Sequence, residues 1–468
     1  MASNNYDFDL VVIGSGPGGY VAAIRASQRG LKTAVVEKDA LGGICLNWGC
    51  IPTKALLKNA EMMHDFNRAA EFGFQVKDLS FDFEKIIQRS REVADVNSRG
   101  VEFLFKKNKI EHIAGFGKLK DEHTVAVLNE KGSEERSLKA RFIMIATGGR
   151  ARSFPGVPFD GEKIISYKEA LILKKMPKKM AVIGAGAIGV EFAYFYNAFG
   201  AEVHLIEMMP NILPVEDSEI SGQLERAFKK QKIKLYTASK VESLEKTKDG
   251  VKLKVSGQKK QTELECDLAL VAVGVQGNVE NLGLEELNIP VEKTAIQVKE
   301  FYQTKVQNIY AIGDVIGAPW LAHVASHEGI IAVEHMAGNK PHPLNYHNVP
   351  GCTYCHPQVA SIGLTEDKAR EAGYELKIGK FPFRASGKAR AAGETDGLVK
   401  LIFDAKYGEL LGAHILGAEA TELIAELGIA KALETTNVEL ENTIHAHPTL
   451  SEAIMEAAGD ASGEAIHI

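Results

Sequence analysis

Two cysteines five positions apart are the residues best suited to chemistry in this chain of 468 residues. Cys45 and Cys50 lie in the run GICLNWGCIPTK, which begins at Gly43. In a straight helix the Cα atoms of residues i and i+5 lie ~8.6 Å apart, whereas a disulfide tolerates Cα separations of about 4.4–6.8 Å. A bonded pair therefore requires a distorted backbone, and Gly43 and Gly49 supply permissive positions for it.

Pro52 predicts that a helix begins close to the second cysteine, because proline costs no hydrogen bond in the first turn. Cys50 would then lie near the positive end of that helix, which lowers the pKa of a thiol and favours redox chemistry. The same spacing suits two buried structural cysteines, and the pair alone leaves both interpretations open.

A glycine-rich loop lies upstream of the cysteines. A strand is predicted over residues 8–13, and it runs into Gly14, Ser15, Gly16, Gly18 and Gly19; an alanine-rich helix and a second strand ending at Glu37 follow. This order is the dinucleotide-binding fingerprint: a tight turn, backbone that can approach a pyrophosphate at a helix N-terminus, and an acid for the ribose. A dithiol next to a cofactor loop indicates electron transfer between sulfur and cofactor.

The fingerprint occurs a second time, after a strand over residues 180–183, with Gly184, Gly186 and Gly189 and an acid at Glu207. The acid follows the first glycine at the same spacing in both copies, which makes a chance match improbable. No lysine or arginine occurs between Glu207 and residue 214. A 2′-phosphate would need such a cation, so the second loop favours NAD over NADP.

Composition sets limits on the remaining possibilities. The length predicts several domains. A net charge of −6 gives no reason to expect nucleic acid or an anionic membrane as a partner. No apolar run approaches the ~20 residues that span a bilayer, and residues 1–10 lack the basic region of a signal peptide. Five cysteines form no disulfide framework. We therefore expect a cytoplasmic protein, or one of an organelle matrix if a presequence has been removed.

A histidine and an acid near the C-terminus could handle the protons of thiol chemistry. Thiol attack requires a thiolate, and His447 has a side chain that titrates near neutral pH. Glu452 follows five residues later, in a helix that Pro448 could start, and could orient the imidazole as the carboxylate does in a Ser-His-Asp triad. Taken alone, His447 is more often a structural histidine.

Together these motifs closely resemble the flavin disulfide oxidoreductases, and within them the dihydrolipoamide dehydrogenases. The resemblance covers essentially the whole chain, and its most specific part is the run HAHPTLSE over residues 445–452. It implies an α/β fold with two Rossmann-like dinucleotide-binding domains, for FAD and NAD, and an α+β C-terminal dimerisation domain. The implied boundaries are 1–149 for the FAD domain, 150–276 for the NAD domain, 277–347 for a central domain completing the FAD site, and 348–468 for the interface domain.

The resemblance also implies a role for each matching residue. The catalytic residues would be Cys45, Cys50, Lys54, His447 and Glu452. The FAD-binding residues would be Gly14, Ser15, Gly16, Gly18, Gly19, Glu37, Lys54, Gly117, Ala146, Thr147, Gly148, Asp314, Leu321, Ala322 and His323. The NAD-binding residues would be Gly184, Gly186, Ile188, Gly189, Glu191, Glu207, Val241 and Gly274. No metal takes part in this chemistry.

The implied enzyme oxidises dihydrolipoamide through a Cys45–Cys50 disulfide and FAD, and produces NADH. It would be a homodimer in which His447 reaches the partner's active site and Lys54 pairs with Glu191. Its partners would be lipoyl domains of 2-oxo acid dehydrogenase complexes or of the glycine cleavage system, with no nucleic acid or membrane partner.

Other interpretations remain open. A glutathione-reductase-like enzyme would want cations after Glu207, and a mercuric-reductase-like enzyme would carry a C-terminal cysteine pair; neither feature is present. A flavin- and NAD-binding scaffold would not need the intact dithiol. Trp48, between the cysteines, and the pair at 275–276 depart from the usual family pattern.

Three further patterns lie outside these motifs. The run CTYCH over residues 352–356 matches the haem-attachment pattern, although two buried cysteines are the better interpretation. In the interface domain we expect an alternating strand over 398–403 and an amphipathic helix over 420–435.

Overall fold

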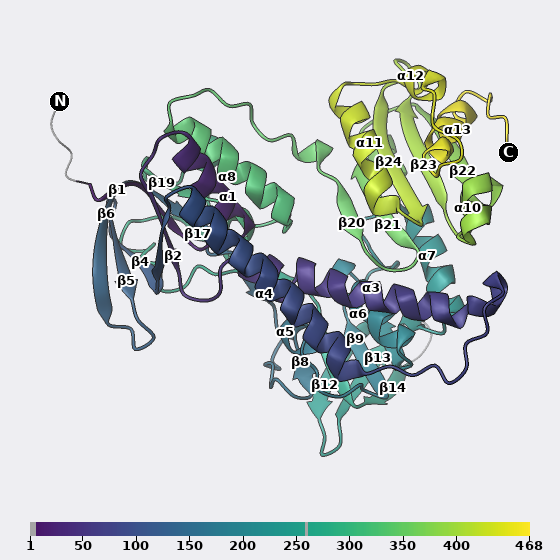
Figure 1. Cartoon of the computed structure of the whole chain (residues 1–468), viewed down its shortest axis with the longest axis horizontal. Helices are drawn as coiled ribbons and strands as arrows, with labels where there is room; N and C mark the ends of the chain where they lie inside the picture. Colours follow the sequence, from purple (N-terminus) through teal and green to yellow (C-terminus); the bar gives the residue numbers. More distant parts are fainter. Residues whose placement is uncertain (1–5, 258–260) are drawn as a thin grey trace. The chain divides into compact units, whose positions relative to one another are not determined.

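The computed structural model describes residues 6–257 and 261–468 and divides them into two compact units. Unit 1 comprises the chain up to Ala55 together with Glu84–Arg152 and Gly274–Leu344, and unit 2 comprises Leu56–Phe83, Ser153–Val273 and Asn345–Ile468. Figure 1 colours the chain by sequence and labels its elements. The first five residues, on which part of the expectation about targeting signals rests, lie outside the described range.

Unit 1 is built on a largely parallel sheet with the strand order β3-β2-β1-β6-β5-β4, to which β19 adds by pairing with β6. Apolar residues line both faces: helices α1, α4 and α8 cover one face, and strands β4 and β5 with residues 282–296 cover the other. The strands are β1 (Phe8–Ile13), β2 (Thr33–Glu37), β3 (Glu111–Ala114), β4 (Phe116–Asp121), β5 (Thr124–Leu128), β6 (Glu134–Ile145), β7 (Gly149–Ala151), β16 (Val275–Gly277), β17 (Val291–Glu292), β18 (Ala295–Ile296) and β19 (Ile309–Ala311). The helices are α1 (Pro17–Gln28), α2 (Gly43–Trp48), α4 (Phe83–Lys107), η2 (Glu300–Tyr302), η3 (Gly313–Ile316) and α8 (Ala322–Met336), with the start of α3 (Cys50–Asn67).

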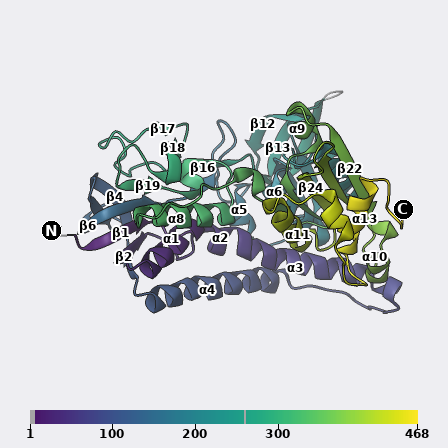
Figure 2. The same cartoon turned by 90° about the horizontal axis from the view of Figure 1, so that it is seen from above.

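Helices α1 and α8 lie side by side in unit 1, as the views of Figures 1 and 2 both show. Their backbones approach closely where glycines face each other: a Cβ added to Gly329 would lie 2.8 Å from the Gly18 carbonyl oxygen. Arg25 and Arg29 on α1 pair with Glu334 on α8 at 2.5 and 2.8 Å. The helix that follows the first glycine loop is therefore fixed along much of its length.

Unit 2 contains a second parallel sheet, with the order β11-β10-β9-β15-β8, and a three-stranded antiparallel sheet, β12-β13-β14. Its strands are β8 (Ile164–Ile165), β9 (Lys179–Ile183), β10 (Glu202–Ile206), β11 (Lys234–Tyr236), β12 (Lys240–Lys246), β13 (Val251–Ser256), β14 (Gln261–Cys266) and β15 (Leu268–Val271). The helices of this part are η1 (Ala69–Phe72), α5 (Tyr167–Ala170), α6 (Ala187–Ala198) and α7 (Ser218–Lys230). Cys266 is a buried core residue.

The C-terminal part of unit 2 is an antiparallel sheet with the order β20-β21-β24-β23-β22. The strands are β20 (Gly351–Thr353), β21 (Gln358–Gly363), β22 (Leu376–Pro382), β23 (Leu398–Asp404) and β24 (Leu410–Gly417). The helices are η4 (Tyr346–Asn348), α9 (Glu366–Glu371), η5 (Phe383–Ala385), α10 (Gly387–Ala392), α11 (Ala420–Ala432), α12 (Asn437–Asn442) and α13 (Glu452–Asp460). Helices α11 and α13 share one apolar core with the sheet. The expected strand and helix are thus present, although α11 ends three residues early.

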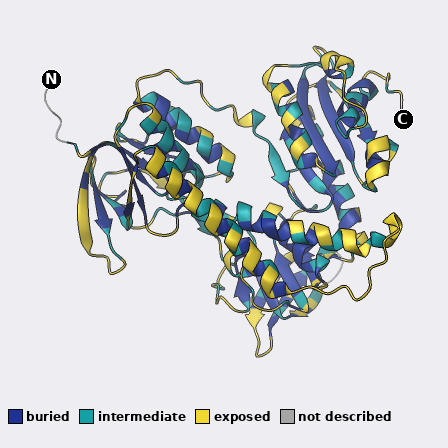
Figure 3. Cartoon of the chain, viewed as in Figure 1, coloured by how far each residue is buried: buried dark blue, intermediate teal, exposed yellow. Residues whose placement is uncertain are grey.

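The prediction of an alternating strand over 398–403 is wrong about exposure. All seven residues of β23 are buried, and Figure 3 shows the strand as uniformly buried. The face opposite the apolar core is covered as well, because Ile402 packs with Ala369 of α9. Lys400 is 2% exposed and contacts the carboxylates of Asp217 and Glu366.

The CTYCH run also differs from its prediction. Cys355 is buried and its thiol donates a hydrogen bond to the Pro357 carbonyl oxygen, 3.1 Å away, but Cys352 is only partly buried. The run spans the end of β20 and the following turn, and its two cysteines therefore lie in different environments.

Candidate active site

The first glycine loop leaves room for a ligand at one position only. Gly14 has a φ of +103°, and a Cβ there would lie 2.3 Å from the Ala146 carbonyl oxygen. A Cβ at Gly19 would lie 2.1 Å from the Gly14 carbonyl oxygen, whereas one at Gly16 would meet no heavy atom within 4 Å. The outer glycines are therefore needed for packing, and Gly16 faces open space where a pyrophosphate could approach the backbone. This arrangement fits a bound dinucleotide.

Glu37 fixes the shape of the same loop. One carboxylate oxygen accepts hydrogen bonds from the backbone N–H of Ser15 at 2.8 Å and from its hydroxyl at 2.7 Å, and the other accepts from the N–H of Asp39 at 2.9 Å. The sequence predicted a role toward a ribose; the structure adds that Glu37 anchors the loop itself.

The cysteine-bearing segment rests directly on the glycine loop. The N–H of Gly42 donates to the Ser15 carbonyl oxygen at 3.1 Å. A Cβ added to Gly43 would lie 2.7 Å from the Cα of Gly16, so only glycine allows this approach. The two motifs that are neighbours in sequence are therefore also in contact in space, at the position where a cofactor pyrophosphate would lie.

The backbone breaks between the two cysteines. Helix α2 ends at Trp48, Gly49 adopts φ −144° and ψ −114°, and α3 begins at Cys50. The predicted distortion and the predicted helix start are thus both confirmed, with Pro52 in the first turn of α3. Cys50 lies at the positive end of an 18-residue helix.

The two sulfurs form a close pair. The pKa of the Cys45 thiol is raised, first by a hydrogen bond shared with Cys50, then by burial and by the charge on Cys50. The ammonium group of Lys54 acts in the opposite direction and favours the Cys45 thiolate. In the dithiol state one proton is thus held between the sulfurs, with a cation one turn along α3 as a counter-charge.

Sequence reasoning missed the residues that hold the segment from outside. Arg91 on α4 donates a hydrogen bond to the Asn47 carbonyl oxygen, and its guanidinium lies 4.7 Å from the centre of the Trp48 ring. Ser98 lies on the same face of α4, about two turns further along. Its hydroxyl donates to the Leu41 carbonyl oxygen at 2.8 Å. Nothing in the local sequence of α4 signals these contacts, because they depend on a helix about 40 residues away in the chain.

Two of the remaining predicted FAD residues lie at the carboxyl ends of neighbouring parallel strands in unit 1. Ala146 follows β6, Asp314 follows β19, and both strands pair at this edge. Ligands of open α/β sheets bind at such ends. Burial and the charge of Glu328 raise the pKa of Asp314 to about 6. Thr147 and Gly148 follow Ala146 in the turn, Gly117 packs against Ile13 from β4, and Leu321, Ala322 and His323 open helix α8.

The second glycine loop in unit 2 repeats the geometry of the first. A Cβ at Gly184 would lie 2.3 Å from the Ala272 carbonyl oxygen, one at Gly189 would lie 1.9 Å from the Gly184 carbonyl oxygen, and one at Gly186 would meet nothing within 4 Å. Glu207 accepts a hydrogen bond from the Ala185 N–H at 2.7 Å. Its neighbour in the chain, Met208, is 66% exposed, so the residue directly after the acid offers no cation to a 2′-phosphate.

The other predicted NAD residues have varied surroundings. Ile188 is exposed in the first turn of α6, and Val241 is buried in β12. Gly274, with φ +119°, lies three residues beyond β15. Glu191 is buried on α6, and one of its oxygens accepts a hydrogen bond from the Tyr354 N–H at 2.9 Å.

His447 and Glu452 form a hydrogen-bonded pair in unit 2. Nδ1 of His447 lies 2.9 Å from one oxygen of Glu452, and the other oxygen accepts from the Thr449 N–H at 2.8 Å. Burial opposes ionisation, but these two hydrogen bonds lower the pKa of Glu452. An ionised carboxylate only accepts, so Nδ1 carries the proton and Nε2 is left as the base. The His447 side chain is 80% exposed, and it can therefore meet an external reactant.

Helix α13 begins at Glu452 rather than at Pro448, which corrects the predicted helix start. The intervening turn places the Thr449 N–H on the Glu452 carboxylate instead of in a helical hydrogen bond. His445, the other histidine of the run, is held between Glu426 and the Thr443 carbonyl oxygen at 2.7 and 2.8 Å, as suits a structural residue.

Within the described parts of the chain, no helix is both long and apolar enough to cross a membrane.

Known proteins match this chain along almost its full length. Residues 8–329 match the family described as pyridine nucleotide-disulphide oxidoreductase, and residues 349–458 match the dimerisation domain of that family. A dihydrolipoyl dehydrogenase of Zymomonas mobilis is 53% identical over 462 residues, covering 98% of this chain and 99% of the relative. One of Bacillus subtilis is 46% identical, with the same two coverages. The crystal structure of LpdA from Mycobacterium tuberculosis aligns with a TM-score of 0.89 at 27% identity, covering 96% of this chain and 98% of that one.

Proposed function

The chain belongs to the pyridine nucleotide-disulphide oxidoreductases, and within them to the dihydrolipoyl dehydrogenases, and from this premise we propose how its residues work. The enzyme is a flavoprotein that oxidises dihydrolipoamide with NAD, and its cofactors are FAD and NAD. The fold class is the α/β arrangement with a C-terminal dimerisation domain that the sequence predicted. The observation that carries the catalytic proposal is the contact between the Cys45 segment and the glycine loop at Ser15 and Gly16.

The reaction starts on the sulfur side. His447 takes a proton from one thiol of dihydrolipoamide at Nε2, and Glu452 stabilises the imidazolium that forms. The substrate thiolate attacks Sγ of Cys45, which breaks the Cys45–Cys50 bond and leaves a thiolate on Cys50. The second substrate thiol displaces Cys45 from the mixed disulfide, and its proton passes to the Cys45 sulfur that leaves. Lipoamide leaves, and the cysteine pair holds the two electrons.

Bound FAD and NAD supply the onward passage of these two electrons from the sulfurs to the nicotinamide. The residues of this chain that would hold FAD are those around Gly16, Glu37, Ala146 and Asp314, and those that would hold NAD surround Gly186 and Glu207. The positive charge of Lys54, which already favours the Cys45 thiolate, keeps a counter-charge beside the reduced pair. The domain boundaries 1–149, 150–276, 277–347 and 348–468 remain predictions.

The dimerisation domain supports a homodimer. We further propose that His447 acts on the Cys45 of the partner subunit, and that the dihydrolipoamide is carried by lipoyl domains of separate proteins. A cytoplasmic or organelle-matrix location would bring the enzyme to such carriers.

A substrate comparison tests this function. Purified holoenzyme should reduce NAD with dihydrolipoamide, and it should not oxidise NADPH with glutathione disulfide at a comparable rate. The variant Cys45→Ser should lose the first activity while keeping its flavin. Activity in the NADPH and glutathione pair alone, or a fully active Cys45→Ser enzyme, would contradict the proposal.

A further inference from the structure

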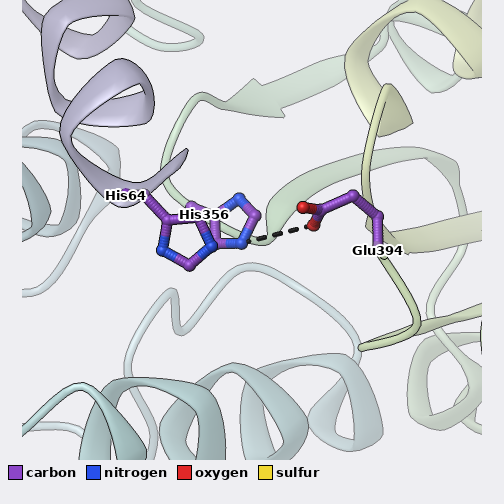
Figure 4. Close-up of side chains that lie close together, drawn as sticks. All are labelled: His64, His356 and Glu394. Carbon is purple, nitrogen blue, oxygen red and sulfur yellow. Dashed lines mark ion pairs between the residues drawn. The ribbon is translucent and has the colours of Figure 1, made fainter. Parts of the chain in front are cut away.

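Two histidines and a glutamate from three separate segments of unit 2 converge, as Figure 4 shows. His64 lies on α3, His356 lies in the turn between β20 and β21, and Glu394 follows α10. One potential ligand atom from each residue lies within 4.8 Å of the other two. The imidazole rings have their centres 4.1 Å apart. Nothing in the proposed reaction uses these residues.

The spacing of the cluster suits an ion better than a hydrogen bond. Nε2 of His356 lies 3.4 Å from a carboxylate oxygen of Glu394, which is longer than an ordinary N–H···O hydrogen bond. Two ligands bonded to a tetrahedral zinc ion at about 2.1 Å lie ~3.4 Å from each other. This pair is therefore already at the edge length of a tetrahedral site, and a potential ligand atom of His64 lies within 4.8 Å of both.

The two imidazoles lie among more carboxylates than cations. Among the charges that act most strongly on them, Arg68 is the cation and four groups are carboxylates: Glu61, Asp65, Glu394 and Asp396. The excess of carboxylates favours a cation at this place.

Arg68 now occupies part of the site. Its guanidinium donates to a Glu394 oxygen at 2.7 Å and lies 3.2 Å from Nε2 of His64. Because arginine can only donate, Nε2 of His64 must be the acceptor, with its lone pair directed into the cluster. A metal ion would compete with the guanidinium for Nε2 of His64 and for the Glu394 carboxylate, whose other oxygen faces His356.

A neighbouring tyrosine has an unsatisfied polar group. The Tyr194 ring stacks on His356 with centres 6.3 Å apart, and its hydroxyl is buried without a hydrogen-bond partner among the described residues. Buried hydroxyls of this kind usually find a partner. An ion with a bound water in its open fourth position would bring a donor and acceptor to this region.

We propose that His64, His356 and Glu394 form a divalent-metal site, suited to zinc by its two imidazoles and one carboxylate, with Arg68 as the competing cation. The ion would join α3, the β20–β21 turn and the segment after α10, and so stabilise unit 2. The dithiol must be kept oxidised in any test, because reduced cysteines also bind zinc.

Equilibrium dialysis of the oxidised holoenzyme against zinc chloride tests the proposal. We expect saturable binding of one zinc ion per subunit and a zinc-dependent rise in melting temperature. His356→Gln should weaken binding at least about tenfold, consistent with the loss of one of three ligands. Arg68→Met should instead tighten it, because the competing cation is gone. His342→Gln, at an exposed histidine outside the cluster, is the matched control and should bind like the wild type.

His356→Gln and Arg68→Met should change the affinity for zinc in opposite directions. Either variant therefore tests the proposal if the other folds poorly. Binding that is unchanged in both His356→Gln and Arg68→Met would place the zinc elsewhere and overturn the proposal. An absence of saturable binding in both the wild type and Arg68→Met would overturn it as well.

Discussion

Two features suit His447 to the proposed role of a base: a hydrogen bond from Nδ1 to Glu452 and a side chain that is mostly exposed. The carboxylate holds Nδ1 at 2.9 Å and is itself held by the Thr449 N–H. The tautomer is thereby fixed, and the free imidazole nitrogen is presented to the reactant. His445, two positions earlier, has a similar contact with Glu426 but little exposure. Exposure, rather than the presence of a carboxylate, separates the proposed base from the structural histidine.

Replacing Glu452 by glutamine should lower kcat/KM with dihydrolipoamide by about 10- to 1000-fold, because the imidazolium formed on proton transfer loses its counter-charge. Glu426→Gln is the matched control, as it removes the carboxylate beside His445. Equal losses in both variants would show that Glu452 acts only on the fold.

Arg91 is the second residue whose effect is local. Its guanidinium stacks on Trp48 and its hydrogen bond ends on the Asn47 carbonyl, within the last turn of α2. Burial lowers the pKa of the guanidinium, which indicates an incompletely solvated charge. Trp48, a departure from the family pattern, thus has a partner that explains it.

Arg91→Met should lower the free energy of unfolding by about 1–3 kcal/mol, because the cation–π contact and a buried hydrogen bond are lost together. It should also slow reduction of the disulfide by NADH, measured by stopped-flow absorbance, because the segment loses its outer support. Arg99→Met, at an exposed position of the same helix, should leave both quantities unchanged. If the disulfide of Arg91→Met is reduced at the wild-type rate, Arg91 does not support the cysteine segment during the reaction.

At the scale of elements, the sequence predicted the features that are encoded within one short segment. It missed the contacts between segments that are far apart in the chain. Strand β1 was predicted with its observed bounds, and both glycine loops have the expected geometry, because strand, turn and helix are encoded within about 30 residues. The break at Gly49 was predictable for the same local reason. The start of α13 was not predictable in this way. Pro448 can begin a helix, but the Thr449 N–H bonds to the Glu452 carboxylate and the helix begins only at Glu452. The contacts of Arg91 could not be predicted, since they join elements far apart in sequence.

Strand β23 shows how a pattern can mislead. A lysine within a strand is typical of a position that faces solvent. In the structure, however, three carboxylates surround the ammonium group of Lys400: Asp217 at 2.9 Å, Glu219 at 3.2 Å and Glu366 at 2.8 Å. Helices α7 and α9 supply these acids. The buried cation therefore fixes two helices to the sheet, and no periodicity within the strand reports it.

Lys400→Met should destabilise unit 2 by about 3–5 kcal/mol, because removing one partner leaves buried carboxylates without their counter-charge. Chemical denaturation followed by circular dichroism measures the change. Lys377→Met, at an exposed position in the neighbouring strand β22, should change stability by less than about 0.5 kcal/mol. A neutral Lys400→Met would mean that apolar packing alone holds the helices.

At the scale of the whole molecule, stability should depend on pH through a buried acid outside the active site. Glu216, just before α7, is almost fully buried, one of its oxygens has no hydrogen-bond partner among the described residues, and burial raises its pKa to about 7. Because the folded pKa is above the unfolded value, its contribution is fully present below about pH 4.5 and is lost as pH rises through about 7.

Glu216→Gln should therefore be more stable than the wild type at pH 8, by on the order of 1–3 kcal/mol, and nearly equal to it at pH 5. Melting temperatures recorded across this range measure the difference. Glu371→Gln, at an exposed acid in α9, should show no such trend. A gain for Glu216→Gln at pH 5 that equals the gain at pH 8 would show that titration is not its cause.

The proposed path of the electrons runs from the sulfur pair to a dinucleotide at the first glycine loop, and the contact of the cysteine segment with that loop is the observation on which it rests. Alkylation with iodoacetamide followed by mass spectrometry tests it directly. In the holoenzyme as isolated, Cys45 and Cys50 should resist modification as a disulfide, and after anaerobic addition of NADH Cys45 should become labelled. Cysteines that are labelled equally with and without NADH would contradict the account.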